Sequence, residues 1–396
     1  MAKQPIRKKI IEQGIAKPEE KPILTLVIDG NSILKQSLVD ETVGTNGKEY
    51  GAIKQCFILM KRIMQWRDWN FCYIVFDGDN SGQLRYDIYP EYKANRDKTF
   101  KNKNQTAYDK AIDDYCKKVL AYSRKKKQLT EAQLKRKETD DERFQHQRDL
   151  LIEMCECLSI RTLMYDEVEG DDLIAYLVKN KQPNEKICIV SGDRDLTQLI
   201  NDDVCVYVTQ KKEVVTHLNS IDKLGYNHEN VVLFKMLCGD TSDNIKGVTG
   251  MGKDTFFKHF PEAVKKKIDL AFIFDRCRTI NDERIKNKQK PLKVLENVLK
   301  SVTTGSQGDK LYEINEKLID LKKHILLTKE AEKDLKEIVG APLDPEGREY
   351  KDLYEIVRDN GMSDILKEDS FGRFFSDFAK LIDNEKKYYK ENTTNS

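Results

Sequence analysis

One ten-residue stretch decides the fold of this 396-residue chain: it reads ILTLVIDGNS and spans residues 23–32. Its first part, Ile23–Ile28, is rich in apolar and β-branched residues without alternation, as expected for a strand buried on both faces of a parallel sheet. Asp29 and a glycine follow, and this pair is common in turns. The stretch therefore predicts a central strand with an acidic side chain at its carboxyl end.

Four later runs share this character, and helical patterns lie between them. Strands that alternate with helices in this way predict an α/β fold with a mostly parallel central sheet flanked by helices. The runs are Phe71–Phe76, Ile160–Met164, Ile187–Val190 and Val204–Val208. The helical patterns are Ala52–Met64, Phe144–Leu158, Asp171–Lys179 and Leu196–Ile200.

Composition excludes several classes of protein. Hydrophobic residues make up 39% of the chain, enough for a core, but no apolar run is long enough to span a membrane. Nine cysteines occur singly apart from the pair Cys155 and Cys157, which favours a reducing, cytoplasmic location. These two with His146 are the nearest candidate for a zinc site, and one turn of a buried helix explains them better.

The chain divides into four expected regions. Residues 1–20 form a basic tail without the apolar stretch of a signal peptide. Residues 21–232 form the α/β core, interrupted by a polar, Lys-rich insertion at 97–140. Residues 233–335 are helical, and residues 336–396 are a helical C-terminal extension.

Acidic residues gather at the predicted strand ends and in two further motifs. In open parallel sheets, sites form outside the carboxyl ends of the strands, so these side chains should converge. A single aspartate at such a place is ordinarily a turn residue or helix cap, but five motifs with this placement favour a shared site. Ligands that are all oxygen suit Mg²⁺ or Mn²⁺, and two such ions would support phosphodiester hydrolysis. The residues are Asp29, Asp77, Glu167, Glu169, Asp171, Asp172, Asp193, Asp195, Asp240 and Asp243.

A basic segment complements these carboxylates. Between Arg85 and Lys137 the chain holds 16 Lys and Arg against 7 Asp and Glu, a local net charge of +9 that leaves −7 for the rest. Arg85, Tyr92 and Arg96 belong to a stretch that mixes aromatic and basic residues, which can stack on bases and contact phosphates. Such a segment is ordinarily a solvated loop, but beside an acidic metal-binding cluster we expect nucleic-acid binding.

A glycine-rich turn is the third element. Gly247, Gly250, Gly252 and Lys253 lie in GVTGMGKDT at 247–255, where a turn that enters a helix exposes backbone N–H groups to an anion. The spacing is not that of a P-loop. A turn between two helices that grips a DNA backbone fits better.

Taken together, seven ordered motifs resemble the 5′-nuclease (flap endonuclease) superfamily. That group includes bacteriophage 5′→3′ exonucleases and ribonucleases H, and the 5′-nuclease domain of bacterial DNA polymerase I. The resemblance covers roughly residues 21–330, but 262–310 is expanded and 331–396 has no counterpart. The motifs are IDGNS at 28–32, FDG at 76–78, RYDIYPEYKANR at 85–96, EGDD at 169–172, SGDRD at 191–195, GDTSDNIKGV at 239–248 and TGMGKDT at 249–255.

The resemblance implies a PIN-like fold with a helical arch and a helix–three-turn–helix region, and it implies roles for the residues. Lys93 and Arg96 would be catalytic at the base of the arch, and the glycine turn would hold duplex DNA, with K⁺. Glu167 lies outside the matched positions. The first metal group would be Asp29, Asp77, Glu169 and Asp171, with Asp172 beside them. The second would be Asp193, Asp195, Asp240 and Asp243.

The resemblance implies a monomeric, Mg²⁺-dependent 5′→3′ nuclease of DNA replication, acting on 5′ flaps, nicks and RNA–DNA hybrids and removing RNA primers. Two rival readings are a PIN-type ribonuclease on free RNA and a non-catalytic DNA-junction binder. The segment Phe371–Phe378 could dock a sliding clamp or a single-strand-binding protein, although an ordinary amphipathic terminal helix explains it better.

Overall fold

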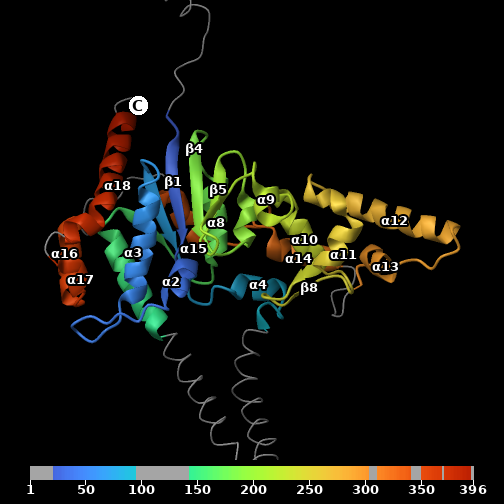
Figure 1. Ribbon diagram of the computed structural model, residues 1–396, viewed down its shortest axis with the longest axis horizontal. Coiled ribbons are helices and arrows are strands. Elements are labelled where there is room, and N and C mark those ends of the chain that lie inside the picture. Colours follow the sequence, from blue (N-terminus) through green and yellow to red (C-terminus); the bar gives the residue numbers. More distant parts are fainter. Residues whose placement is uncertain (1–20, 95–141, 303–309, 340–348, 368–369, 394–396) are drawn as a thin grey trace, which may run out of the picture.

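A six-stranded sheet forms the centre of the computed structural model, which describes residues 21–94, 142–302, 310–339, 349–367 and 370–393 (Figure 1). The strand order is β3-β2-β1-β4-β5-β6, and the first five strands are parallel. β1 lies in the middle, as predicted. The strands are β1 (Ile23–Asp29), β2 (Phe71–Val75), β3 (Ile160–Leu163), β4 (Glu185–Ser191), β5 (Val204–Val208) and β6 (Glu213–Val215).

Two details differ from the sequence prediction. The short strand β6 pairs with β5 in the antiparallel direction at the sheet edge, and three residues are too few to show a pattern in sequence. The predicted helix Leu196–Ile200 is instead the 3-10 helix η2, Asp195–Leu199. Both lie where the chain turns tightly after a strand.

Helices cover both faces of the sheet, and a helical region follows it along the chain. The helix at 142–156 follows the insertion along the chain. Up to residue 238, the other described α-helices are α2 (Gly30–Ser37), α3 (Gly51–Met64), α4 (Gln83–Ile88), α8 (Gly170–Lys179), α9 (Ser220–Leu224) and α10 (Val231–Cys238). After residue 238, the described α-helices are α11 (Lys253–His259), α12 (Leu270–Lys286), α13 (Lys293–Leu299), α14 (Leu311–Ile319), α15 (Lys329–Ile338), α16 (Tyr350–Asp359), α17 (Ser363–Leu366) and α18 (Ser370–Thr393).

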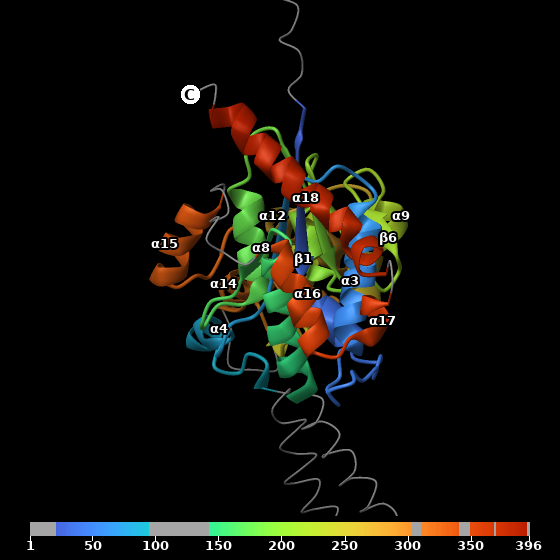
Figure 2. The same ribbon diagram turned by 90° about the vertical axis from the view of Figure 1, so that its left-hand side faces the viewer.

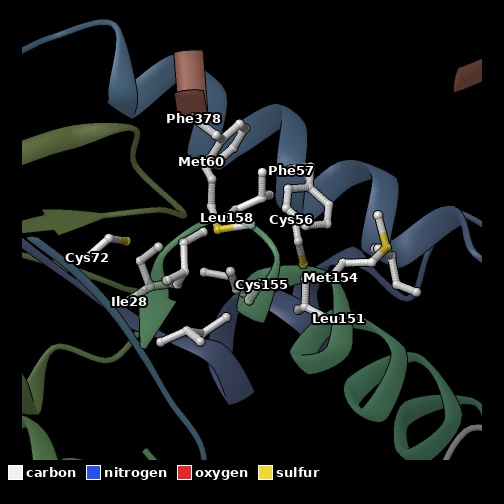
Figure 3. Close-up of a cluster of buried hydrophobic side chains, with 14 of the residues drawn as sticks. Ile28, Cys56, Phe57, Met60, Cys72, Leu151, Met154, Cys155, Leu158 and Phe378 are labelled. Atoms are coloured by element: carbon white, nitrogen blue, oxygen red, sulfur yellow. The ribbon is translucent and has the colours of Figure 1, made fainter. Parts of the chain in front are cut away.

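Alternate strand residues pack into two separate hydrophobic layers. On one face Ile28 and Cys72 contact α3, the helix at 142–156 and α18 (Figures 2 and 3). On the other face Val27 and Tyr73 contact α8, η2 and α15. Burial on both faces explains why the strand sequences do not alternate.

The C-terminal extension is part of this core. Phe375 and Phe378 of α18 are fully buried, and their rings lie 5.4 and 5.6 Å from the ring of Phe57 on α3. Arg161 of β3 also forms a buried ion pair with Glu385 of α18. The chain's own core therefore covers Phe375 and Phe378, as in an ordinary amphipathic terminal helix, and docking of a sliding clamp or single-strand-binding protein by the rest of Phe371–Phe378 stays a prediction.

Two other sequence expectations can be compared with the described residues. Cys155 and Cys157 are buried in the hydrophobic layer beside α3, and the cysteines that the structure describes are all free thiols. No described helix has the length and apolar character that crossing a membrane requires.

Candidate active site

Two aspartates at the ends of neighbouring strands are held by short loops. Asp29 ends β1 and caps α2, accepting hydrogen bonds from the Ser32 amide at 2.9 Å and from the Ser191 hydroxyl at 2.6 Å. Asp77 follows β2 and accepts a hydrogen bond from the Gly170 amide, at the start of α8, at 2.8 Å. These helix N-termini fix the direction of both carboxylates.

Asp171, in the first turn of α8, lies at the centre of the acidic cluster. Burial raises the pKa of Asp171 well above its usual value, and the charges of Asp193, Asp29, Glu169 and Asp77 raise it further. Burial also raises the pKa of Asp29 to about 6, against its hydrogen bonds to Ser191 and Ser32. The structure thus brings five predicted site residues, three from strand ends and two from the start of α8, close enough to repel one another.

Glu169 connects this cluster to the basic segment. It is 6% exposed and receives the Lys93 ammonium, the Tyr92 hydroxyl at 3.0 Å and the Arg85 guanidinium at 2.8 Å. Although burial opposes ionisation, Arg85 and Lys93 lower the pKa of Glu169 below its usual value. Lys93 also lies over the Tyr92 ring, and its backbone amide binds the Asp243 carbonyl at 2.8 Å. The predicted catalytic lysine is therefore inside the acidic site.

Two residues that we expected to contact DNA are buried instead. Arg85 is 4% exposed, and its guanidinium binds Glu169, Asp172 and the Leu318 carbonyl. Tyr92 is 2% exposed. The prediction that they contact DNA directly is wrong for this arrangement. Their side chains compensate buried carboxylates, which would otherwise carry a large desolvation cost.

The side chain of Asp172 is directed to protein partners. It is fully buried, and its oxygens accept from Arg85 at 2.5 Å and from the Leu326 amide at 2.8 Å. Burial raises the pKa of Asp172 in spite of the charge of Arg85. Asp172 thus anchors α8 and Arg85, whereas the preceding residue faces the acidic cluster.

A second acidic group surrounds Lys235. Its aspartates were predicted from sequence, but Lys235 was not. The Lys235 ammonium forms ion pairs with Asp195 and, at 2.6 Å, with Asp240. Burial and Asp193 raise the pKa of Asp195 to about 6, with Lys235 opposing them. Asp193 therefore interacts electrostatically with both groups. One signal was available: Lys235 is the only charged residue in the apolar helix VVLFKMLC.

The remaining predicted residues of this region do not share one location. Asp243 lies 3.4 Å from the Tyr92 hydroxyl. Glu167 is exposed in a turn with positive φ, outside the cluster. Arg96 and the insertion 97–140 lie outside the described residues.

The glycine turn connects the β7–β8 hairpin (Gly239–Asp240 and Ile245–Lys246) to α11. A Cβ on Gly247 would lie 2.3 Å from the Cys238 carbonyl carbon, so the two backbones can approach only at glycine. Gly250 has φ +86° and is exposed. Gly252 caps α11, and Lys253 is exposed at its first position. Three of the four predicted turn residues thus reach the surface.

The predicted carboxylates are the kind of ligand that divalent cations such as Mg²⁺ prefer. All of them are oxygen ligands, and burial, with added repulsion from neighbouring carboxylates, raises the pKa values of Asp29 and Asp171. Among the described residues, no three Asp, Glu, His or Cys side chains converge closely enough to ligate one ion as they stand. A cation would have to draw these side chains together.

Comparison with known proteins places the chain in a family. Residues 24–225 match the family model of the 5′-3′ exonuclease N-terminal resolvase-like domain. The chain belongs to the 5′-3′ exonuclease family. It is 29% identical to a 5′-3′ exonuclease of Aquifex aeolicus over 173 residues, which are 36% of this chain and 60% of that protein. It is also 29% identical to DNA polymerase I of Bacillus subtilis over 152 residues, which are 37% of this chain and 17% of the polymerase.

Solved structures show the same fold. The T5 D15 protein crystallised with metal ions is 19% identical, with a TM-score of 0.53 over 84% of this chain and 99% of that chain. The T5 5′-exonuclease with bound zinc is 17% identical, with a TM-score of 0.55 over 85% and 98%. The predicted PIN-like fold of this exonuclease family is thereby confirmed.

Proposed function

We propose that the chain is a Mg²⁺-dependent, structure-specific 5′→3′ nuclease that hydrolyses phosphodiesters at 5′ ends, flaps and RNA primers during DNA replication. The observation that carries the proposal is the cluster around Asp171, where several carboxylates repel one another and Lys93 lies within hydrogen-bonding distance of Glu169. Membership of the exonuclease family supports it. The likeness to T5 5′-exonuclease supports the fold on which it depends.

The chain's own residues would share the work in distinct ways. Lys93 is 20% exposed in its side chain and pairs with Glu169, which places its ammonium where it would donate to a phosphate oxygen at the mouth of the site. Arg85 and Tyr92 would position Glu169 from behind. Arg96, the second predicted catalytic cation, stays a proposal from sequence.

Divalent cations would be held by two groups of oxygen ligands. Bound there, they would supply an activated water and balance the charge of the scissile phosphate. Mn²⁺ would substitute for Mg²⁺ because both prefer carboxylate oxygens. Asp172 is the least accessible of the proposed ligands, since Arg85 and Leu326 occupy its oxygens. The first group is Asp29, Asp77, Glu169 and Asp171, with Asp172, and the second is Asp193, Asp195, Asp240 and Asp243.

Labelled substrates test the proposal directly. Flap, nicked and RNA–DNA duplexes labelled at the 5′ or the 3′ end would be incubated with and without Mg²⁺. We expect Mg²⁺-dependent products from the 5′ end, and Asp193→Ala should abolish them while retaining duplex binding. Asp222→Ala, at an exposed position on α9, is the matched control and should cut normally. Turnover by Asp193→Ala in Mg²⁺ would refute the assignment.

The same experiment distinguishes the rival functions. A PIN-type ribonuclease would cut free single-stranded RNA and ignore the flap. A non-catalytic junction binder would give no product at all. The exposed glycine turn favours a duplex substrate, and a K⁺ ion at that turn, a monomeric state and a cytoplasmic location remain part of the proposal.

A further inference from the structure

A cluster of lysines lies at the connection between α12 and α13. Residues 286–293 read KNKQKPLK and contain four lysines, no acidic residue and no aromatic residue. We call this segment the α12–α13 tip. All four lysines are exposed, and within the described residues Lys286, Lys288 and Lys290 have no carboxylate within 4.0 Å. Lys293 has one loose ion pair, with Glu296 at 3.9 Å.

The backbone of the tip is held in one conformation by specific side chains. The Arg284 guanidinium donates to the Lys290 carbonyl at 2.9 Å. Asn281 is buried, and its carbonyl oxygen accepts from the Leu292 amide at 2.8 Å. A solvated loop needs no such clamps, so the lysines are presented from a fixed support.

The support is continuous with the glycine turn. The side chain of Val294, one residue after the tip, lies 3.5 Å from the position that a Cβ on Gly250 would occupy. Asn297 of α13 donates to the Thr249 carbonyl at 3.0 Å, and the Thr249 amide donates to the Val302 carbonyl at 2.9 Å. The tip and the exposed residues Gly250, Gly252 and Lys253 thus belong to one packed unit.

The tip extends away from the acidic cluster. In Figure 1 the carboxyl end of β1 is near the lower centre of the molecule, and the α12–α13 connection forms the right-hand end. The 17 residues of α12 span about 26 Å at the rise of an α-helix. Double-helical DNA rises about 3.4 Å per base pair, so this length corresponds to about eight base pairs.

We propose that the α12–α13 tip is a second phosphate contact for duplex DNA, which continues the surface of the glycine turn. Lysines without aromatic neighbours can bind phosphates but have no ring on which a base can stack, so the tip suits a duplex backbone better than a single strand. The inference deepens the proposed nuclease function and rests on it.

The test measures duplex binding without cleavage. Wild-type protein and the variant K286Q/K288Q/K290Q/K293Q would be titrated with a labelled flap duplex in EDTA over a range of KCl concentrations. Each lost phosphate contact lowers the slope of log K against log salt by about 0.9, so we expect a slope lower by about 2 or more. A variant with Lys380, Lys386, Lys387 and Lys390 of α18 changed to Gln is the matched control, with the same change of net charge at exposed positions.

Duplex length and cleavage make the outcome decisive. The defect should be present with a downstream arm of about 20 base pairs and vanish with one of about 6, and the single-turnover cleavage rate at saturating enzyme should be unchanged. An unchanged salt slope, or an equal fall in the α18 control, would overturn the proposal. Failure of wild-type protein to cleave would instead refute the nuclease function, because the binding measurement does not depend on cleavage.

Discussion

At the scale of single residues, the site is a balance between buried carboxylates and a few cations. Arg85 and Lys93 lower the pKa of Glu169, whereas Asp29 and Asp171 have raised pKa values. The cations therefore stabilise the charge of Glu169, whereas burial and repulsion by other carboxylates oppose the charges of Asp29 and Asp171. That asymmetry is what a divalent cation would relieve.

Lys93→Ala should lower the single-turnover cleavage rate at least about 100-fold, as expected when a donor to developing charge is removed. Duplex affinity should change little, because the side chain is mostly enclosed by Tyr92 and Glu169. Rapid-quench cleavage at saturating enzyme measures the rate. Lys179→Ala, at the exposed far end of α8, controls for the loss of a lysine. A normal rate in Lys93→Ala would show that the ammonium does not reach the phosphate.

Asp29 predicts a pH dependence of stability in metal-free protein. Its pKa is about 6 in the folded chain, against 3.8 for a fully solvated aspartate, so the folded state binds the proton more tightly than the unfolded chain does. The stabilisation from protonated Asp29 is therefore full below about pH 4 and is lost as pH rises through 6. Asp29→Asn should gain melting temperature relative to wild type as pH rises from 5 to about 7. The exposed substitution Asp222→Asn should show no such gain, and parallel curves for Asp29→Asn and wild type would contradict the assignment.

Residue positions could be predicted from sequence better than side-chain directions. Asp29, Asp77 and Asp193 were found because strand ends in a parallel sheet share an edge. The directions of Arg85 and Tyr92 could not be found, because a basic and aromatic composition is the same whether the side chains face DNA or a buried Glu169.

At the scale of elements, the glycine turn contains one glycine that packs closely against another backbone segment and another that is open to solvent. Gly247 packs against the end of α10, while Gly252 has open space around its Cα. The hairpin β7–β8 brings the two ends of this segment together. Sequence alone grouped these glycines, although only the three-dimensional contacts separate their roles.

The two glycines make a matched pair for mutation. Gly247→Ala should destabilise the fold, because its Cβ would lie 2.3 Å from the carbonyl carbon of Cys238 and 2.4 Å from the Gly239 amide nitrogen. Gly252→Ala should fold normally, since no atom lies within 4 Å of its Cβ position. Thermal melts followed by duplex-binding titrations would measure both effects. Equal melting temperatures for the two variants would contradict this packing.

At the scale of the whole molecule, the C-terminal extension completes the layer beside α3. Phe57 contacts Phe375 and Phe378 although more than 300 residues separate them in sequence. From sequence, 336–396 was predicted to be an appendage because the family motifs end earlier. An amphipathic helix shows its apolar face in sequence, but the element that this face covers is set by the tertiary fold.

Phe378→Ala should lower the free energy of unfolding by about 3–5 kcal/mol, as for other fully buried aromatic side chains. Urea unfolding measured at the sheet and at α18 should give one shared transition, because both belong to one hydrophobic layer. Tyr354→Ala, at a side chain that is 47% exposed, is the control and should cost far less. Separate transitions for α18 and the sheet would show an independent C-terminal module.

The contact between Phe57 and α18 also bears on synthesis. A ribosome makes α3 first, and its partners Phe375, Phe378 and Leu381 emerge only about 300 residues later. The nascent chain must therefore carry an uncovered apolar helix for about 300 residues of elongation, where chaperones would be expected to bind it. Because the strands that bear Asp29 and Asp77 share this layer, we expect the acidic site to become rigid only once residue 381 has left the exit tunnel.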